Sequence, residues 1–137
     1  MAVLVDSSTW VQAERRRLSA AAIGALAEDE PLALSVVTAS ELLQGVLRST
    51  DLSFRVRRER FVRWVLDTFP VLAFDLPVAE IHAQLWSDLA ASGSTIGPHD
   101  LIIAATALAH GHALLTDNVR EFRRVPGLDV RQPRWTP

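Results

Sequence analysis

Short apolar segments alternate with helix-forming segments along the whole chain, and this alternation is the feature that most restricts its fold. Five apolar segments are predicted strands: the opening MAVLVD, Leu32–Val37, Val71–Phe74, Ala113–Thr116 and Leu128–Val130. Parallel strands need crossover connections, and helices usually supply them. We therefore expect an α/β fold, in which helices cover both faces of a central parallel sheet of four to five strands.

The segments between these strands carry helix start and stop signals. Ser8 is expected to cap the first helix, and Thr38-Ala39-Ser40-Glu41 resembles a capping box that starts a helix directly after the second strand. Pro98 is expected to open an apolar helix that ends at Gly111. The remaining helices are expected at Ser19–Ala27, Leu52–Thr68 and Pro77–Ala91, with a short turn from Asp117 towards Phe122.

Composition narrows the class of protein. The chain has 137 residues, 49% of them hydrophobic and 22% charged, which excludes intrinsic disorder and suits one domain over residues 1–137. It has no cysteine, so disulfide scaffolds, zinc ribbons and thiol nucleophiles are excluded. No apolar run approaches the roughly 18 residues of a membrane span. The opening segment does not resemble a signal peptide, so we expect a cytoplasmic protein without a membrane partner.

Four of the sixteen acidic residues lie at the ends of predicted strands or in the predicted first turns of helices. Asp6 and Asp117 end predicted strands, and Glu41 lies in the predicted first turn of the helix after the second strand. Ligands bind beyond the carboxyl ends of parallel strands, so these three are expected at one edge of the sheet. In the simplest arrangement the helix of Asp100 begins at the opposite edge, which leaves its position open. Asp75 also follows a strand, and the spacing does not exclude it.

Clustered carboxylates would repel one another unless a cation lay between them. Mg²⁺ or Mn²⁺ takes hard oxygen ligands and can stabilise charge on a phosphoryl oxygen, so the pattern predicts phosphodiester hydrolysis. Each acid also has a structural interpretation as a helix cap, an Asx turn or a charge at a helix N-terminus. A non-catalytic α/β regulatory or partner-binding module is therefore the alternative. A haloacid-dehalogenase-type phosphatase is rejected, because Ser8 occupies the position of its second aspartate.

All fourteen basic residues are arginines, and six of them lie between Arg48 and Arg63 against two acids. The planar guanidinium group donates two hydrogen bonds to one phosphate, so this stretch is a candidate nucleic-acid contact. The alternative is a solvated helix face. Arg55 and Arg58 are the residues that we expect to contact RNA if the first interpretation holds.

The segments VLVDSSTW, SVVTASELLQG, IGPHDLIIAATALAHG and LLTDNVREF resemble, in order and spacing, the four acidic motifs of PIN-domain ribonucleases, specifically the VapC-type toxins of bacterial toxin–antitoxin pairs. The resemblance implies a three-layer α/β/α PIN domain and an Mg²⁺-dependent endoribonuclease, with Mn²⁺ able to substitute. It places the acidic quartet on Asp6, Glu41, Asp100 and Asp117, with Asp6 and Asp100 as principal metal ligands, and leaves Asp75 out.

The same resemblance implies supporting residues and partners. Thr116 and Asn118 flank Asp117 and would orient it by hydrogen bonds. The expected partners are an RNA substrate, a second copy of the chain in a homodimer, and a VapB-type antitoxin whose C-terminal segment covers the active groove.

Overall fold

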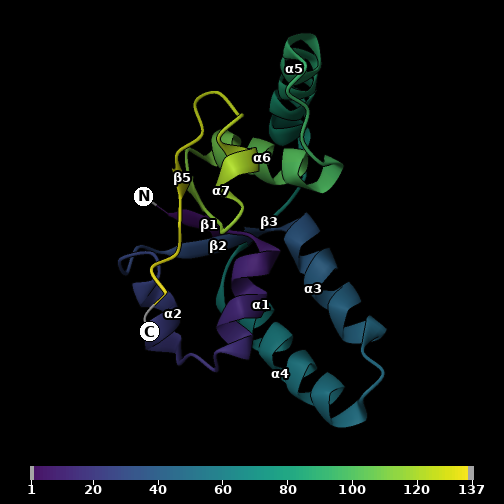
Figure 1. Ribbon diagram of the computed structural model, residues 1–137, viewed down its shortest axis with the longest axis vertical. Coiled ribbons are helices and arrows are strands. Elements are labelled where there is room, and N and C mark those ends of the chain that lie inside the picture. The colour runs from purple at the N-terminus through teal and green to yellow at the C-terminus, as the bar shows by residue number, and fades with distance from the viewer. Residues whose placement is uncertain (1, 136–137) are drawn as a thin grey trace.

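The computed structural model describes residues 2–135, which form one parallel sheet between two layers of helices (Figure 1). The strand order is β3-β2-β1-β4-β5, and all four neighbouring pairs are parallel. The strands are β1 (Val3–Val5), β2 (Leu32–Ser35), β3 (Val71–Leu72), β4 (Ala113–Leu115) and β5 (Val130–Arg131). The three-layer α/β/α architecture predicted from the alternating pattern is confirmed.

Helices cover the sheet on both faces, with α1 to α4 on one side and α5 to α7 on the other (Figure 1). They are α1 (Ser7–Arg15), α2 (Ala20–Ala25), α3 (Val36–Arg48), α4 (Leu52–Thr68), α5 (Leu76–Ser92), α6 (Pro98–His110) and α7 (Val119–Phe122). The bounds predicted for α4 are confirmed, as are the proline start of α6 and its end at Gly111, which has a φ of 65°. No helix within residues 2–135 is long and apolar enough to cross a membrane.

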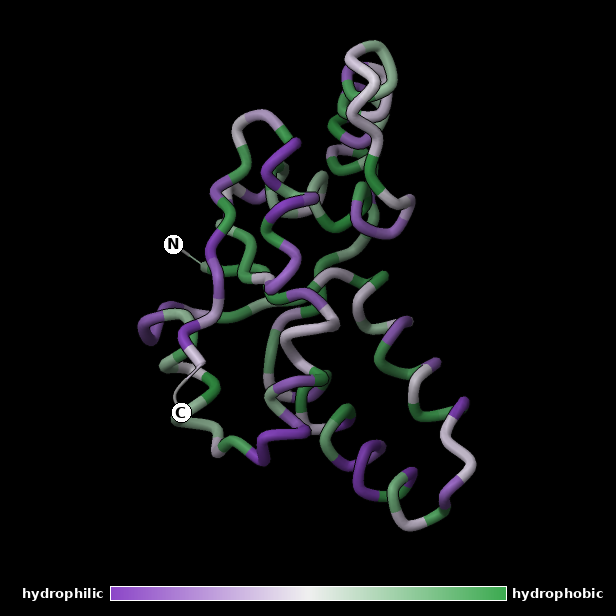
Figure 2. Tube along the Cα trace, in the orientation of Figure 1, coloured by the Kyte–Doolittle hydropathy of each residue, from purple (hydrophilic) through white to green (hydrophobic). Residues whose placement is uncertain are grey.

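The two faces of the sheet each contact a separate apolar core. In β1, Val3 and Val5 pack against the helices α1 to α4, whereas Leu4 packs against α5 and α6 on the other face. Leu114 in β4 likewise faces the second core. Because side chains alternate along a strand, strands buried on both faces must be apolar throughout. Figure 2 shows these apolar strands crossing the middle of the molecule.

Two predicted helix starts were wrong. Asp6, not Ser8, caps α1, because its Oδ1 accepts the Thr9 N–H at 3.1 Å. Ser35 caps α3 by accepting the Thr38 N–H at 3.2 Å, so this helix begins at Val36. Glu41 therefore lies in the second turn of α3 and is not part of a capping box. The structure therefore excludes the interpretation of Glu41 as a helix-capping residue.

Asp75 has a clear structural role. It precedes α5, and its Oδ1 accepts the Val78 N–H at 3.2 Å as the cap of that helix. The strand before it is also shorter than predicted, because β3 ends at Leu72. This placement explains why Asp75 follows a strand without invoking a ligand.

Candidate active site

Asp6 lies at the carboxyl end of β1, between the first turn of α1 and the end of β4. Its residue surface is only 5% exposed. One carboxylate oxygen accepts the Ser8 hydroxyl at 3.0 Å in addition to the capping contact, and the other accepts the Thr116 hydroxyl at 2.5 Å. These contacts fix a buried carboxylate at this edge of the sheet.

Asp100 lies in the first turn of α6, close to other carboxylates. Burial raises its pKa to about 6, with further increases from the charges of Glu121, Asp6 and Glu41, whereas the neighbouring His99 acts in the opposite direction. The sequence left the position of Asp100 open, because the simplest arrangement considered there had α6 begin at the opposite edge of the sheet. A crossover helix runs antiparallel to the strand that follows it, so α6 starts at the carboxyl edge. The Gly97 N–H before α6 donates to Glu121 Oε1 beyond β4 at 3.0 Å, in agreement with this geometry.

Glu41 brings an incompletely satisfied carboxylate to the same place. Its Oε1 is buried and has no hydrogen-bond partner within the described part of the chain. Its Oε2 lies 3.4 Å from His99 Nδ1. A buried polar oxygen without a hydrogen-bond partner costs free energy. A bound ligand that contacts Glu41 Oε1 would remove this cost.

Glu121 in α7 is the acid that the sequence interpretation missed. Its Oε1 accepts the Gly97 N–H, and its Oε2 accepts the Asn118 side-chain amide at 2.9 Å. These two contacts lower the pKa of Glu121, the Asn118 contact most. Glu121 therefore remains ionised beside Asp100. The signal that could have found it is its spacing: it lies one helical turn after Asn118, on the short helix that follows a strand end.

Asp117 points elsewhere. Both of its carboxylate oxygens accept a hydrogen bond from the indole Nε1–H of Trp135, at 3.0 and 3.2 Å. The side chains of Thr116 and Asn118 bond to Asp6 and Glu121 instead of orienting Asp117 as expected. The structure thus gathers Asp6, Glu41 and Asp100, adds Glu121, and directs Asp117 towards the C-terminal segment.

The chemistry of this carboxylate group fits a hard divalent cation. It consists of oxygen donors, one of them a buried oxygen without a partner in the described chain, and burial together with the neighbouring carboxylates raises the pKa of Asp100. In this conformation, no three His, Cys, Asp or Glu residues between 2 and 135 lie close enough together to bind a metal ion. Binding of an ion there would therefore require these side chains to move closer together.

A groove of about 490 Å³ lies along α1 and α3, and of the four carboxylates Glu41 is among its lining residues. Ser7, Ser8 and His99 line it together with Glu41, and the basic residues Arg15, Arg48 and Arg58 line it as well. Arg58 is itself buried, with Nε 3.2 Å from Glu14 Oε1 and its guanidinium group over the Phe54 ring. Of the two arginines proposed from sequence for RNA contact, the groove includes Arg58, whereas Arg55 is not among its lining residues. Arg15 was missed because it is distant from the arginine-rich stretch.

Comparison with known proteins places the chain in a family. The model of the PIN domain family matches residues 3–128. Ribonuclease VapC1 of Rickettsia felis is 34% identical over 130 residues, which cover 95% of each chain.

Solved structures agree with this placement. A chain in the crystal structure of VapBC2 from Rickettsia felis, bound to a DNA fragment from their promoter, has a TM-score of 0.84 and 25% identity, covering 99% of this chain and 100% of that one. A chain of VapBC-5 from Mycobacterium tuberculosis, a member of the VapBC family of toxin-antitoxin systems, has a TM-score of 0.76 and 29% identity, with 98% of each chain covered. The chain therefore belongs to the PIN-domain family and, within it, to the VapC ribonucleases.

Proposed function

We propose that this VapC ribonuclease is the toxin of a type II toxin–antitoxin pair and cleaves RNA internally with Mg²⁺ held by Asp6, Glu41, Asp100 and Glu121. The observation that carries the proposal is the convergence of these four carboxylates at the carboxyl edge of the sheet, where burial and the three other acids raise the pKa of Asp100. Mn²⁺ is expected to substitute, because it accepts the same oxygen ligands. Asp117, the fourth acid expected from the resemblance, is proposed to have a supporting role.

Each residue of the site has a distinct task in this proposal. When bound, the cation supplies Lewis-acid stabilisation of the charge that develops on the phosphate during hydrolysis. Thr116 and Ser8 hold the Asp6 carboxylate in one orientation by donating to its two oxygens. Asn118 and the Gly97 N–H do the same for Glu121. Such outer contacts orient ligands and keep them ionised, so the site is ready before the substrate arrives.

The groove provides a path for the RNA backbone beside the carboxylates. Arg15, Arg48 and the accessible part of Arg58 line it, and guanidinium groups bind phosphate oxygens in pairs. The pairing of the buried Arg58 with Glu14 supports a role in shaping the groove wall. Arg55 is the weaker of the two original candidates, because it lies outside the lining.

Partners follow from the relatives. We propose a VapB-type antitoxin whose C-terminal segment covers the groove, a homodimer of this chain, and a location in the cytoplasm. The chain, as a single PIN domain over residues 1–137, would supply the nuclease to this complex.

A direct experiment compares purified wild type with two matched amide variants, Glu121→Gln and Asp117→Asn, on RNA with Mg²⁺ and with a chelator. Wild type should cleave only with metal. Glu121→Gln should lower the cleavage rate about 100-fold, because it removes a charge next to the ion, whereas Asp117→Asn should lower it much less. The reverse ranking would return Asp117 to the metal site. A wild-type protein with neither cleavage nor metal binding would favour the non-catalytic partner-binding module.

A further inference from the structure

The C-terminal segment ends in a contact with the loop that follows β4. After β5, residues 132–135 cross the molecule towards α1 and α2 (Figure 1). There the Trp135 indole N–H donates to both oxygens of Asp117, eighteen residues earlier in the chain. One donor shared between two carboxylate oxygens holds the plane of the Asp117 carboxylate in a single direction.

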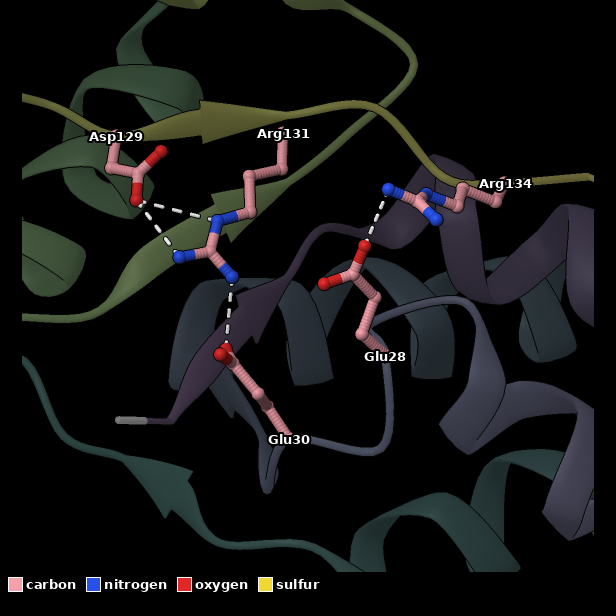
Figure 3. A network of polar contacts seen from close by, with 5 residues as sticks. All are labelled: Glu28, Glu30, Asp129, Arg131 and Arg134. Carbon is pink, nitrogen blue, oxygen red and sulfur yellow. Dashed lines mark hydrogen bonds and ion pairs between the residues drawn. The ribbon is translucent and has the colours of Figure 1, made fainter.

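Trp135 is fixed by further contacts on its own side. The guanidinium carbon of Arg16 lies 4.5 Å from the centre of its ring, and the ring packs against the core on the α1–α4 face. Arg134 forms an ion pair with Glu28, and Arg131 forms one with Glu30 at 2.9 Å (Figure 3). The tail is therefore held by ion pairs at Arg131 and Arg134, and again at Trp135, where it contacts Asp117.

Asp117 lies between two residues that hold the active-site acids. Thr116 donates to Asp6, and the Asn118 backbone N–H donates to the Thr116 hydroxyl at 2.9 Å. The Asn118 side chain donates to Glu121. Three consecutive residues thus connect the tail with two acids in different parts of the fold, Asp6 at the end of β1 and Glu121 in α7. A change in the direction of this loop would move both contacts together.

We propose that Trp135 is a positioning residue for the carboxylate site, acting through Asp117. The Trp135–Asp117 pair, called the clamp below, holds residues 116–118 so that Thr116 and Asn118 face Asp6 and Glu121. It also directs the Asp117 carboxylate away from the other acids, because its charge would add to their mutual repulsion if it faced them. The inference rests on the proposed function for its consequence on metal binding, but the clamp itself is a feature of the metal-free protein.

The test uses Trp135→Phe, which keeps an aromatic ring under Arg16 and removes the N–H donor. Trp64→Phe is the matched control, because Trp64 is also a partly buried aromatic, packed against Phe61 and Phe69. Asp117→Asn examines the same contact from the other side. Two measurements are made on full-length protein. The first is Mn²⁺ affinity, measured by calorimetry without RNA. The second is hydrogen exchange of the Asn118 backbone N–H, measured without metal.

Trp135→Phe should weaken Mn²⁺ binding roughly 3- to 10-fold. Loss of a residue that directly contacts a metal ligand typically weakens metal binding about 10- to 100-fold. The effect of Trp135→Phe should be smaller, because Trp135 contacts Asp117 and not a metal ligand. Cleavage should fall at low Mg²⁺ and recover at high Mg²⁺, which a general loss of folding would not produce. The Asn118 amide should exchange at least about 10-fold faster, since its hydrogen bond depends on the loop. Trp64→Phe should change neither Mn²⁺ affinity nor Asn118 exchange.

Unchanged Asn118 exchange in both Trp135→Phe and Asp117→Asn would overturn the clamp, whatever the metal result. Faster exchange with unchanged Mn²⁺ affinity would overturn its positioning role. If wild type binds no Mn²⁺ but Asn118 exchange still responds, the proposed metal site fails while the clamp stands. The two failures are therefore distinguishable.

Discussion

Two groups of carboxylates in this molecule differ in what compensates their charge. Near the C-terminal tail, three acids have arginine partners: Glu30 and Asp129 contact Arg131, and Glu28 contacts Arg134 (Figure 3). At the carboxyl edge of the sheet, hydroxyl and amide groups hold Asp6 and Glu121. Glu41 there keeps one buried oxygen without a partner in the described chain.

The difference separates a structural use of charge from a functional one. Exposed ion pairs contribute little, about 0–1 kcal/mol, because water already solvates both partners. Acids grouped by the fold without cations instead raise the free energy of the empty protein, as the pKa of Asp100 indicates. A fold retains such a group when an external cation completes it.

The largest expected effect is loss of cleavage at the uncompensated group. Asp6→Ala and Asp100→Ala should each lower the rate of RNA cleavage by about 10³-fold or more, since the cation contributes several kcal/mol to the transition state. The matched control is Glu30→Gln, which changes a carboxylate that has an arginine partner. Gel-based cleavage assays with circular dichroism as a folding check measure this. If both alanine variants cleaved RNA at the wild-type rate, the carboxylates at the edge of the sheet would have no functional role that separates them from the acids paired with arginines.

A third environment, the buried pair of Glu14 and Arg58, should give the largest change in stability. Their side chains are 7% and 9% exposed, so Glu14→Gln leaves a guanidinium group buried without its counter-charge. We expect a loss of about 3 kcal/mol in the free energy of unfolding, measured by urea denaturation. Glu28→Gln, in the exposed pair with Arg134, should cost less than about 1 kcal/mol. Equal losses would show that burial does not separate these pairs.

Arginines of the groove should differ from those of the tail in RNA binding. Arg48→Gln should weaken RNA binding several-fold and reduce the salt dependence of binding by about one phosphate contact. Arg134→Gln, whose arginine contacts Glu28, should change the slope little. Titrations at several salt concentrations measure both. Identical slopes in wild type and Arg48→Gln would assign Arg48 to a role other than phosphate contact.

The smallest effect concerns pH and stability without metal. Because the pKa of Asp100 is about 6 in the folded protein and 3.8 ordinarily, the folded state binds a proton more tightly. Stability should therefore decrease as pH rises from about 4 through 6, and the penalty should be complete above that range. Asp100→Asn should raise the melting temperature by a few degrees at pH 7.5 and leave it nearly unchanged at pH 4.

Added Mg²⁺ gives the complementary measurement. It should raise the melting temperature of wild type at pH 7.5 and much less at pH 5, where Asp100 is mostly protonated. A metal response of equal size at both pH values would contradict the involvement of Asp100.

Local sequence predicted the elements whose signals are local. The apolar strands, the span of α4, and the proline and glycine at the ends of α6 are all encoded within a few residues of the features that they determine. The start of α3 was predicted wrongly because two capping patterns lie close together, and Ser35 prevails over Thr38. Capping depends on backbone direction, which residue types alone do not specify.

The sequence by itself determined the α/β class and the candidates Asp6 and Glu41, because alternation and position after a strand are properties of chain order. Asp100 was expected in the site only from the resemblance to PIN-domain ribonucleases. Only the tertiary structure decided that Glu121 faces Asp100 while Asp117 faces Trp135, and that Arg58 pairs with Glu14. These choices join residues up to 44 positions apart or depend on which way a side chain points. Hydrogen bonds and charges act through space over a few ångströms, so they become defined only when the folded chain brings their partners together.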